Sequence, residues 1–242
     1  MCDLIRDNPL ALAVSNGDDE AGPFATHLPV IPDPDGAPPA GDLTGSTLLA
    51  HMNRANPHWK SLRTGDVILL TFTGPHAYVS PAVYEVTPAA PTWDFTAVHV
   101  RGVVEVIDSL DGALALVQAT ARLFEDRFGA GWDQTESIEY FRKIVPGVGA
   151  FRVAVTAAES MFKLSQEQPA EVRERVRRSF GARACTRQRA VADLMDKLPG
   201  KATETLAAPE SEIGGPHEIS AFESLCPRGP SNTTSLDAAL AP

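Results

Sequence analysis

The sequence predicts a mainly β protein with helices, in which a small β-barrel carries helical decoration. Three observations lead to this fold class. Several short apolar runs of strand length occupy the first 107 residues, a long amphipathic helix follows, and a last strand-like run comes after it. Several short strands with packed helices are typical of small barrels. At 242 residues the chain is long enough to bury a core in one domain that carries a tail.

The first strands are expected at residues 10–15 and 23–31, where apolar residues dominate on both sides of Asn16 and Gly17. An Asn-Gly step between two such runs is typical of a hairpin, here with a long acidic turn. The stretch 33–42 is rich in proline and glycine and is expected to be a surface loop. A third strand is expected at residues 44–50.

Residues 51–62 suit a short helix, which Pro57 should break or kink because proline has no backbone N–H to donate. Residues 66–73 form a continuous apolar run and residues 97–107 alternate, so both are expected to be strands. Between them we expect a loop punctuated by prolines and rich in aromatic residues.

The clearest helix is expected at residues 109–128, with Gly129 as its stop. Its apolar residues recur at helical spacing and should face the core: Leu110, Leu114, Val117, Ala121, Phe124 and Phe128. A shorter helix around 136–143 and a last strand at 149–156 follow. The charged segment 171–180 is expected to form an exposed helix with a solvated arginine-rich face.

The composition argues against several classes of function. A net charge of −10 disfavours a nucleic-acid partner held through phosphate contacts. No apolar run approaches the roughly 18 to 20 residues that span a membrane, and the first residues lack the order of a secretion signal, so we expect a cytoplasmic protein. The scattered Cys2, Cys185 and Cys226 indicate neither a disulfide framework nor a zinc knuckle.

Three central blocks, residues 51–59, 72–81 and 91–100, hold four of the six histidines and two of the three tryptophans. Buried imidazole and indole N–H groups each need a partner, so their concentration indicates a ligand site. If residues 51–58 are helical, His51, Arg54 and His58 share one face. At ~1.5 Å per residue the two histidines lie about 10 Å apart along the axis, too far to clamp one small ion. One of them could still ligate a metal or a haem iron.

Other common sites are not supported. HxxxH, CxxC and HExxH spacings are missing, as are GxGxxG and GxxxxGK[ST], which disfavours a zinc hydrolase, a Rossmann site and a P-loop. A triad assembled from Ser80, a histidine and Asp94 would lack the GxSxG elbow.

The second and third blocks suit a pocket wall. His76, Tyr78 and Ser80 alternate, so in extended backbone they project to one side. Trp93 and Phe95 flank Asp94, a mixture suited to stacking on a flat cofactor or to closing a dimer interface. The alternative is that these are interface aromatics whose polar tips are satisfied.

Together with Lys163, Leu164, Ser165 and Gln166, these blocks resemble the PaiB-type branch of the flavin-binding split-barrel family over roughly residues 7–180. The resemblance implies a split β-barrel homodimer with cofactor sites at the subunit interface. Within the family the chain looks most like the piperazate synthases, which bind haem b instead of flavin and close N5-hydroxy-L-ornithine into L-piperazate. Segments 145–151 and 161–169 add to this likeness, since Glu167, Gln168 and Pro169 follow where general PaiB-like members more usually have Asn-Arg-Pro.

The resemblance also implies roles for individual residues. The axial imidazole would be His58 or His51, with His76 and His99 in reserve, and Arg54 or else Lys163 would bind the substrate carboxylate. The base that accepts a proton from the α-ammonium group would be Tyr84, Asp94, His99 or Glu167, which the sequence leaves unranked. His76, Trp93, Ser165 and Gln166 would line the cofactor pocket. The alternatives are an FMN-binding flavoprotein and a PaiB-like transcriptional regulator.

The expected organisation is a split-barrel cofactor-binding domain over residues 1–180, a helical extension over 181–200 and a disordered tail over 201–242. The tail is rich in Ala, Ser, Pro, Gly and Glu and cannot bury enough apolar surface to offset its ordering entropy. Compared with full-length relatives, we expect a segment before the first strand to be missing. The expected partners are a small-molecule substrate and a second copy of the chain, without nucleic acid or membrane.

Overall fold

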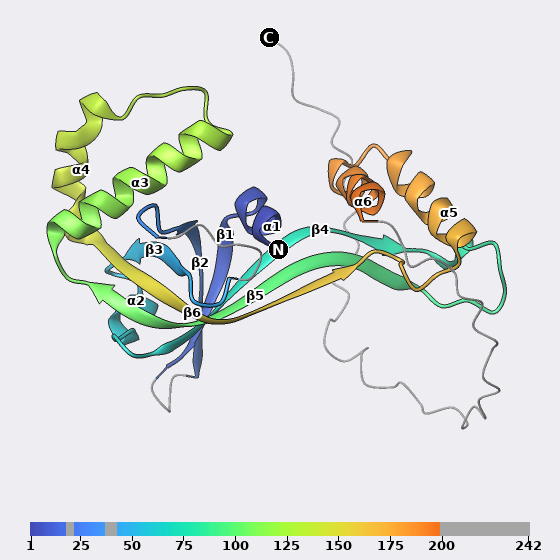
Figure 1. Cartoon of the computed structure of the whole chain (residues 1–242), viewed down its shortest axis with the longest axis horizontal. Helices are drawn as coiled ribbons and strands as arrows, with labels where there is room; N and C mark the ends of the chain where they lie inside the picture. Colours follow the sequence, from blue (N-terminus) through green and yellow to red (C-terminus); the bar gives the residue numbers. More distant parts are fainter. Residues whose placement is uncertain (18–21, 37–42, 199–242) are drawn as a thin grey trace, which may run out of the picture. The chain divides into compact units, whose positions relative to one another are not determined.

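Six antiparallel strands form a closed barrel in the computed structural model, which describes residues 1–17, 22–36 and 43–198 (Figure 1). The order around the barrel is β1-β2-β3-β6-β5-β4, and pairing of β1 with β4 closes it. The strands are β1 (Leu10–Asn16), β2 (Pro23–Pro32), β3 (Thr47–Asn53), β4 (Val67–Val79), β5 (Thr92–Ile107) and β6 (Val148–Lys163). The predicted mainly β fold with helices is confirmed, and so is the hairpin formed by the first two strands.

Six α-helices and three short 3-10 turns decorate the barrel within the described residues. The helices are α1 (Cys2–Asp7), α2 (Pro57–Ser61), α3 (Leu110–Phe128), α4 (Ile138–Ile144), α5 (Ala170–Gly181) and α6 (Thr186–Lys197). The 3-10 turns are η1 (Pro81–Val83), η2 (Thr135–Ser137) and η3 (Val145–Gly147). None of these helices is long and apolar enough to cross a membrane.

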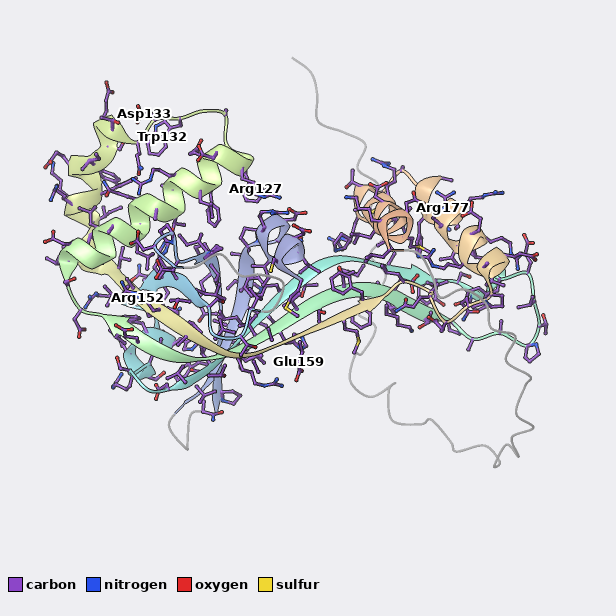
Figure 2. All side chains as sticks on the ribbon, in the orientation of Figure 1. Arg127, Trp132, Asp133, Arg152, Glu159 and Arg177 are labelled. Atoms are coloured by element: carbon purple, nitrogen blue, oxygen red, sulfur yellow. The ribbon has the colours of Figure 1, made fainter. Side chains whose placement is uncertain are left out.

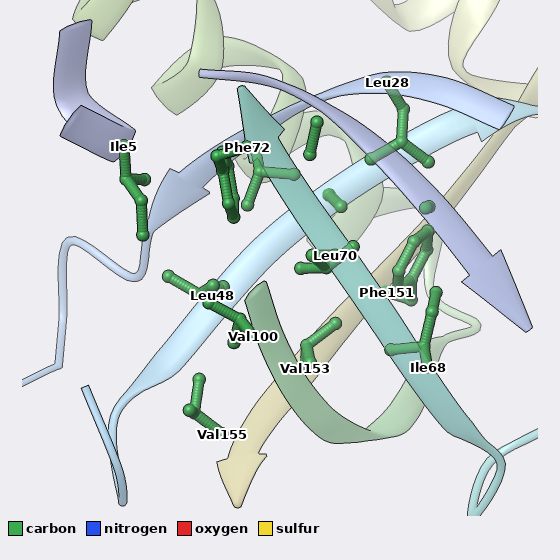
Figure 3. Packing of buried hydrophobic residues seen from close by; sticks show 14 of the residues in the cluster. Ile5, Leu28, Leu48, Ile68, Leu70, Phe72, Val100, Phe151, Val153 and Val155 are labelled. Carbon is green, nitrogen blue, oxygen red and sulfur yellow. The ribbon is translucent and has the colours of Figure 1, made fainter. Parts of the chain in front are cut away.

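The barrel interior is filled by every second residue of its strands, as the two-residue period of a strand requires (Figure 3). Buried members from five strands are Leu28, Leu48, Ile68, Leu70, Phe72, Val100, Phe151 and Val153. Side chains at the intervening positions point outward, and on β3 these include Leu49 and His51. The interior is therefore apolar, and the polar candidates lie outside it.

Strands β4, β5 and β6 run well past the barrel wall. We call their extended parts, residues 72–79, 92–99 and 159–163, the ribbon; Figure 1 shows it reaching to α5 and α6. The predicted loop between residues 73 and 97 is therefore wrong at its two ends, 74–79 and 92–96, which are strand, whereas residues 80–91 do form a connection outside the strands. A β-bulge between Thr73 and His76 accommodates Gly74 and Pro75, and a Cβ at Gly74 would lie 2.3 Å from Thr96 Oγ1.

The predicted helix over residues 51–62 is also wrong in its first half. His51 lies in β3, Arg54 in the following turn, and only Pro57 to Ser61 is helical. Pro57 begins the helix, because proline suits the first helical position, and Asn56 caps it by accepting from His58 N at 3.0 Å. The three candidate side chains consequently do not share a helix face.

Helix α3 begins and ends as predicted, with Ser109 Oγ accepting from Gly112 N at 3.1 Å as its cap. Its buried residues pack on the outside of the barrel with Leu49 of β3. Leu110 and Phe128, expected in the core, are 55% and 54% exposed because the two ends of α3 extend beyond the surface that it covers.

Helices α5 and α6 cover one face of the ribbon. The prediction of an exposed helix over residues 171–180 is wrong for one face of α5. This face buries Val172, Val176 and Phe180 against Ala77 and Tyr84. These residues recur every four positions and form one apolar stripe between the arginines. Helix α6 lies where a helical extension was predicted, and residues 1–198 belong to one compact unit. The predicted disordered tail, residues 201–242, lies outside the described residues.

Candidate functional site

Two of the segments named in the sequence analysis, residues 51–59 and 145–151, meet where β3 pairs with β6. His51 is opposite Ala150, and the backbone N–H of Arg54 donates to Gly147 O at 2.9 Å. The Arg54 Nε donates to Val148 O at 2.9 Å, and the guanidinium lies 5.5 Å from the centre of the Trp59 ring. We call His51, Arg54 and Trp59, with residues 147–150, the barrel site.

His51 contributes a ring nitrogen without a hydrogen bond. Its Nδ1 is buried and has no partner among the described residues. Burial lowers the pKa of the His51 imidazole, which favours the neutral ring. A neutral imidazole with an unpartnered nitrogen is the form that ligates a metal. The barrel site therefore contains an imidazole with one buried nitrogen that lacks a partner among the described residues.

His58, the other candidate ligand, has both ring nitrogens occupied. Its Nε2 lies 2.9 Å from Ser15 Oγ, and its Nδ1 lies 3.0 Å from Thr26 Oγ1. The ring is 1% exposed and stacks on Phe24 with the centroids 5.5 Å apart. Burial also lowers the pKa of His58. In this conformation His58 joins α2 to β1 and β2, and it offers no nitrogen to a cofactor.

The outward face of the ribbon carries the aromatic candidates. The rings of His76 and Tyr78 lie 5.6 and 6.0 Å from that of Trp93, which confirms that positions 76 and 78 project to one side. Tyr78, Trp93 and Met161 are 48%, 51% and 58% exposed. Lys163 donates from Nζ to Thr92 Oγ1. A large aromatic and apolar surface is thus left uncovered in the single chain.

Ser80, expected beside His76 and Tyr78, instead caps the short turn η1, where its Oγ accepts from Ala82 N at 3.3 Å. Because Ser80 caps this turn, two of the three alternating side chains, His76 and Tyr78, lie on the outward face.

The opposite face of the ribbon holds a buried carboxylate. Asp94 is 0% exposed and accepts two hydrogen bonds from Ser165, one from its N–H at 3.0 Å and one from its Oγ at 2.7 Å. Ser165 has a φ of 55°, a left-handed conformation that these bonds hold in place. Gln166 bonds through its amide to Leu164 N and Phe162 O. Ser165 and Gln166 therefore shape the turn after β6.

Three of the four candidate bases lie near one another. Burial raises the pKa of Asp94, and the charge of Glu167 adds to this rise, while the Ser165 hydrogen bonds and Lys163 oppose it. Burial also raises the pKa of Tyr84, with further contributions from Asp94 and Glu167. Tyr84 is 4% exposed, whereas Glu167 is exposed. We call Tyr84, Asp94 and Glu167, with Lys163, the ribbon cluster.

His99, the fourth candidate base, is separate from the ribbon cluster. It lies on the outward face of β5, is exposed, and is opposite Glu159 of β6.

Within one chain the barrel site and the ribbon cluster are far apart. Asp94 and Ile107 are both on β5, and Ile107 pairs with Ala150, the residue opposite His51. Thirteen residues at about 3.3 Å each give a path of about 40 Å along the strand. No single haem or flavin contacts both groups of side chains in one copy of the chain.

Sequence reasoning missed the partners that hold the candidates in place. Ser15 and Thr26 beside His58 are common small polar residues, and only the tertiary pairing shows their use. The contact between Gly149 and Trp59 could have been predicted from the sequence, because glycine in a strand often marks a close approach of another group. A Cβ at Gly149 would lie 2.3 Å from the Trp59 ring. A cavity of about 930 Å³ between α1, the ribbon and α6 was also missed, and Gln166 is the one predicted site residue that lines it.

Residues 1–157 match the family model described as "Putative FMN-binding domain". The chain belongs to this FMN-binding family. The predicted PaiB-type family is thereby confirmed.

Relatives of this family member are known in bacteria and fungi. Protease synthase and sporulation protein PAI 2 of Bacillus subtilis is 27% identical over 169 residues, which cover 68% of this chain and 75% of the relative. An uncharacterized protein of Aspergillus fumigatus is 30% identical over 223 residues, covering 73% of this chain and 84% of the relative.

Among solved structures, the FAD and haem binding protein from Mycobacterium smegmatis is 18% identical with a TM-score of 0.46, covering 66% of this chain and 68% of that one. HutZ, the haem storage protein from Vibrio cholerae, is 13% identical with a TM-score of 0.38, covering 67% and 92%. At such identities and scores these likenesses carry no information on the ligand of this chain.

Proposed function

We propose that this member of the FMN-binding family is a cytoplasmic, homodimeric enzyme that uses haem b to convert N5-hydroxy-L-ornithine into L-piperazate with loss of water. The observation that carries the proposal is the buried, unpartnered Nδ1 of His51 in the barrel site, three residues from the guanidinium of Arg54. This pair offers one donor for an iron ion and one cation for a carboxylate.

His51 fits the role of axial ligand better than His58. A haem iron held by a single histidine needs a neutral imidazole with an unused nitrogen. Both conditions hold at His51, whereas both nitrogens of His58 already lie against hydroxyl groups. When bound, haem would supply a Lewis-acidic ferric ion that weakens the N–O bond of the substrate.

The proposed reaction is balanced without an oxidant or reductant. The α-amine forms a bond to N5, the N5–O bond breaks, and the hydroxyl oxygen leaves as water with a hydrogen from the amine. Only the neutral amine is a nucleophile, so the protein must accept a proton from the α-ammonium group. A nicotinamide is not required, which agrees with the missing GxGxxG motif.

Arg54 is suited to hold the substrate carboxylate. Its Nε bond to Val148 O and its contact with the Trp59 ring fix the plane of the guanidinium. The terminal nitrogens have no hydrogen-bond partner in the described part of the chain, so they can form a two-point contact with a carboxylate. Lys163 has its ammonium group on Thr92 and is the second choice.

Glu167 is the best-placed base of the four candidates. Asp94 and Tyr84 are buried, so neither reaches a substrate without a rearrangement, and His99 lies apart from the ribbon cluster. Glu167 is exposed and follows the turn that the bonds between Asp94 and Ser165 hold. We assign Asp94 the role of positioning this turn.

The separation of about 40 Å along β5 requires a second copy of the chain if His51 and Glu167 act on one substrate. The uncovered Tyr78, Trp93 and Met161 support such a contact, because monomeric proteins rarely leave large apolar side chains grouped on one face. We propose a two-fold homodimer in which the ribbon of each copy lies against the barrel site of its partner.

A second candidate is an FMN-binding flavoprotein, and the match of residues 1–157 to an FMN-binding family favours it. In that case, across the proposed dimer, the aromatic group of His76, Tyr78 and Trp93 from one copy would stack on the flavin ring, and Arg54 of the other copy would bind the phosphate.

The ultraviolet-visible spectrum of protein produced with ample iron and haem precursor separates the two candidates. We expect a Soret band, and turnover of N5-hydroxy-L-ornithine to a product lighter by one water in mass spectrometry. His51→Ala should lose both, and His27→Ala, the matched control at an exposed histidine of β2, should keep both. Flavin bands would favour the second candidate, and a colourless protein that also fails reconstitution with haem would refute the enzyme.

A further inference from the structure

A second cavity lies outside both groups of candidate residues. It has a volume of about 440 Å³ and lies between α3 and the segment 131–138. Figure 2 shows Trp132 and Asp133 of this segment next to α4. Gln118 and Arg122 of α3 line the other side. No residue of the proposed haem enzyme lines this cavity, so its role is independent of that function.

Gln134 lines this cavity with a side chain that is mostly buried. The side chain is 9% exposed, and its Nε2 donates to the backbone oxygen of Gln118 at 3.4 Å. Because a carbonyl oxygen only accepts, this bond fixes which end of the amide is the nitrogen. The remaining Oε1 is buried and has no partner among the described residues. Buried polar atoms are nearly always paired, so this oxygen calls for a donor from a ligand.

The charges around the cavity specify the kind of donor. Glu125, Asp126 and Asp133 line it with one opposing cation, Arg122, which leaves an excess of negative charge. Glu125 also accepts from the backbone N–H of Trp132 at 3.4 Å, and this bond joins the segment to α3. A cation is therefore favoured over a neutral donor.

An organic cation fits this site better than a metal ion. In the part of the chain that the structure describes, no three His, Cys, Asp or Glu side chains are grouped so as to hold a metal. Trp132 lines the cavity, is 47% exposed and packs its ring at 6.3 Å from that of Phe141. An indole face attracts ammonium groups, which adds to the attraction of the carboxylates.

We propose that this cavity binds a small organic ammonium ion, such as an alkyl diamine. One ammonium group donates to Gln134 Oε1, and the positive charge is balanced by Asp126 and Asp133. Trp132 contacts the alkyl chain or the second ammonium group. A volume of about 440 Å³ accommodates a ligand of this size.

The test is isothermal titration of the full-length protein with 1,4-diaminobutane at constant ionic strength, followed in parallel by tryptophan fluorescence. We expect saturable binding at one site per chain. Gln134→Leu, which keeps the shape and removes the acceptor, should weaken binding about tenfold, or about 1.4 kcal/mol. Gln188→Leu on α6 makes the same chemical change away from the cavity and should leave binding unchanged.

A neutral ligand and a second pair of variants test the proposal further. The neutral 1-butanol should not bind, since the site selects charge. If Gln134→Leu does not fold, the exposed Asp126→Asn and Asp133→Asn together should weaken binding to a similar degree. Absence of saturable binding, or equal affinities for the wild type and Gln134→Leu, would overturn the proposal. Because haem binding is not measured, failure here is distinguishable from failure of the proposed enzyme.

Discussion

Two inactive variants should restore activity to each other when their subunits are combined. In the proposed dimer each site takes His51 from one copy and Glu167 from the other, because about 40 Å of β5 separates these regions within a chain. His51→Ala alone and Glu167→Gln alone should each be inactive, since every site of such a dimer lacks one of the two residues. A mixed dimer contains one site with both residues intact.

The expected size of the restored activity follows from counting sites. Random pairing of equal amounts of the two variants makes about half of all dimers mixed, and each mixed dimer has one intact site of two. The mixture should therefore reach about one quarter of the wild-type rate. Isolated mixed dimers should reach about half of that rate.

The assay uses coexpression of the two variants with different affinity tags, so that successive purification isolates the mixed dimer. Piperazate formation is then measured by mass spectrometry against both parent variants. Mixed dimers that form and remain at the background rate would refute the shared site. A protein that elutes as a monomer at assay concentration would refute the dimer itself.

Three further predictions concern single residues. Arg54→Lys keeps the charge and loses the planar two-point contact, so KM should rise about tenfold with little change in kcat; an unchanged KM in steady-state kinetics would remove Arg54 from substrate binding. His58→Ala should lower the free energy of unfolding by about 3 kcal/mol through loss of two buried hydrogen bonds and packing on Phe24, while leaving haem retention intact. Since burial lowers the pKa of His58 in the folded state, its contribution to stability is present above the unfolded pKa, near 6.5, and is lost as the pH falls through the folded pKa. Urea unfolding should therefore show a fall in wild-type stability on acidification that is smaller in His58→Ala, and equal slopes would contradict this. Gly149→Ala would place a Cβ 2.3 Å from the Trp59 ring, so we expect a loss of about 1 to 3 kcal/mol and weaker haem binding; thermal melting identical to wild type would contradict the contact.

The parts of the fold that sequence predicted well are those set by local periodicity. The spacing of apolar residues and the stop at Gly129 predicted α3, and the runs around Asn16 predicted the first hairpin. The spacing of Val172, Val176 and Phe180 also indicates an apolar stripe, but the arginines between them led to the prediction of an exposed helix.

The errors came from residues whose effect depends on a distant partner. Gly74 and Pro75 suggest a loop, and only the opposite Thr96 shows that a bulge carries the strand past them. Pro57 reads as a helix breaker until Asn56 is seen to cap a helix that begins there.

The candidate site shows the same dependence on tertiary structure. Sequence placed His51 and Asp94 in one predicted ligand site, yet it could not show that β5 separates them, because that separation follows from strand pairing and not from distance along the chain. Nor could it show which histidine keeps a nitrogen unpaired, since Ser15 and Thr26 lie far from His58 in the sequence.

The two faces of β5 determine which changes in length the protein tolerates. Trp93 points outward and Asp94 inward, and the extra residue of each nearby bulge, at 73/76 and 101/102, lies on β4 or β6, so the alternation along β5 is unbroken from Trp93 to Val104. Deleting one residue between 94 and 100 would reverse the phase, placing the indole among the buried residues and the carboxylate in water. The connection over residues 80–91 lies outside the strands, so insertions there leave the alternation unchanged. Length variation among relatives should therefore concentrate in that connection and be absent from the adjoining strand.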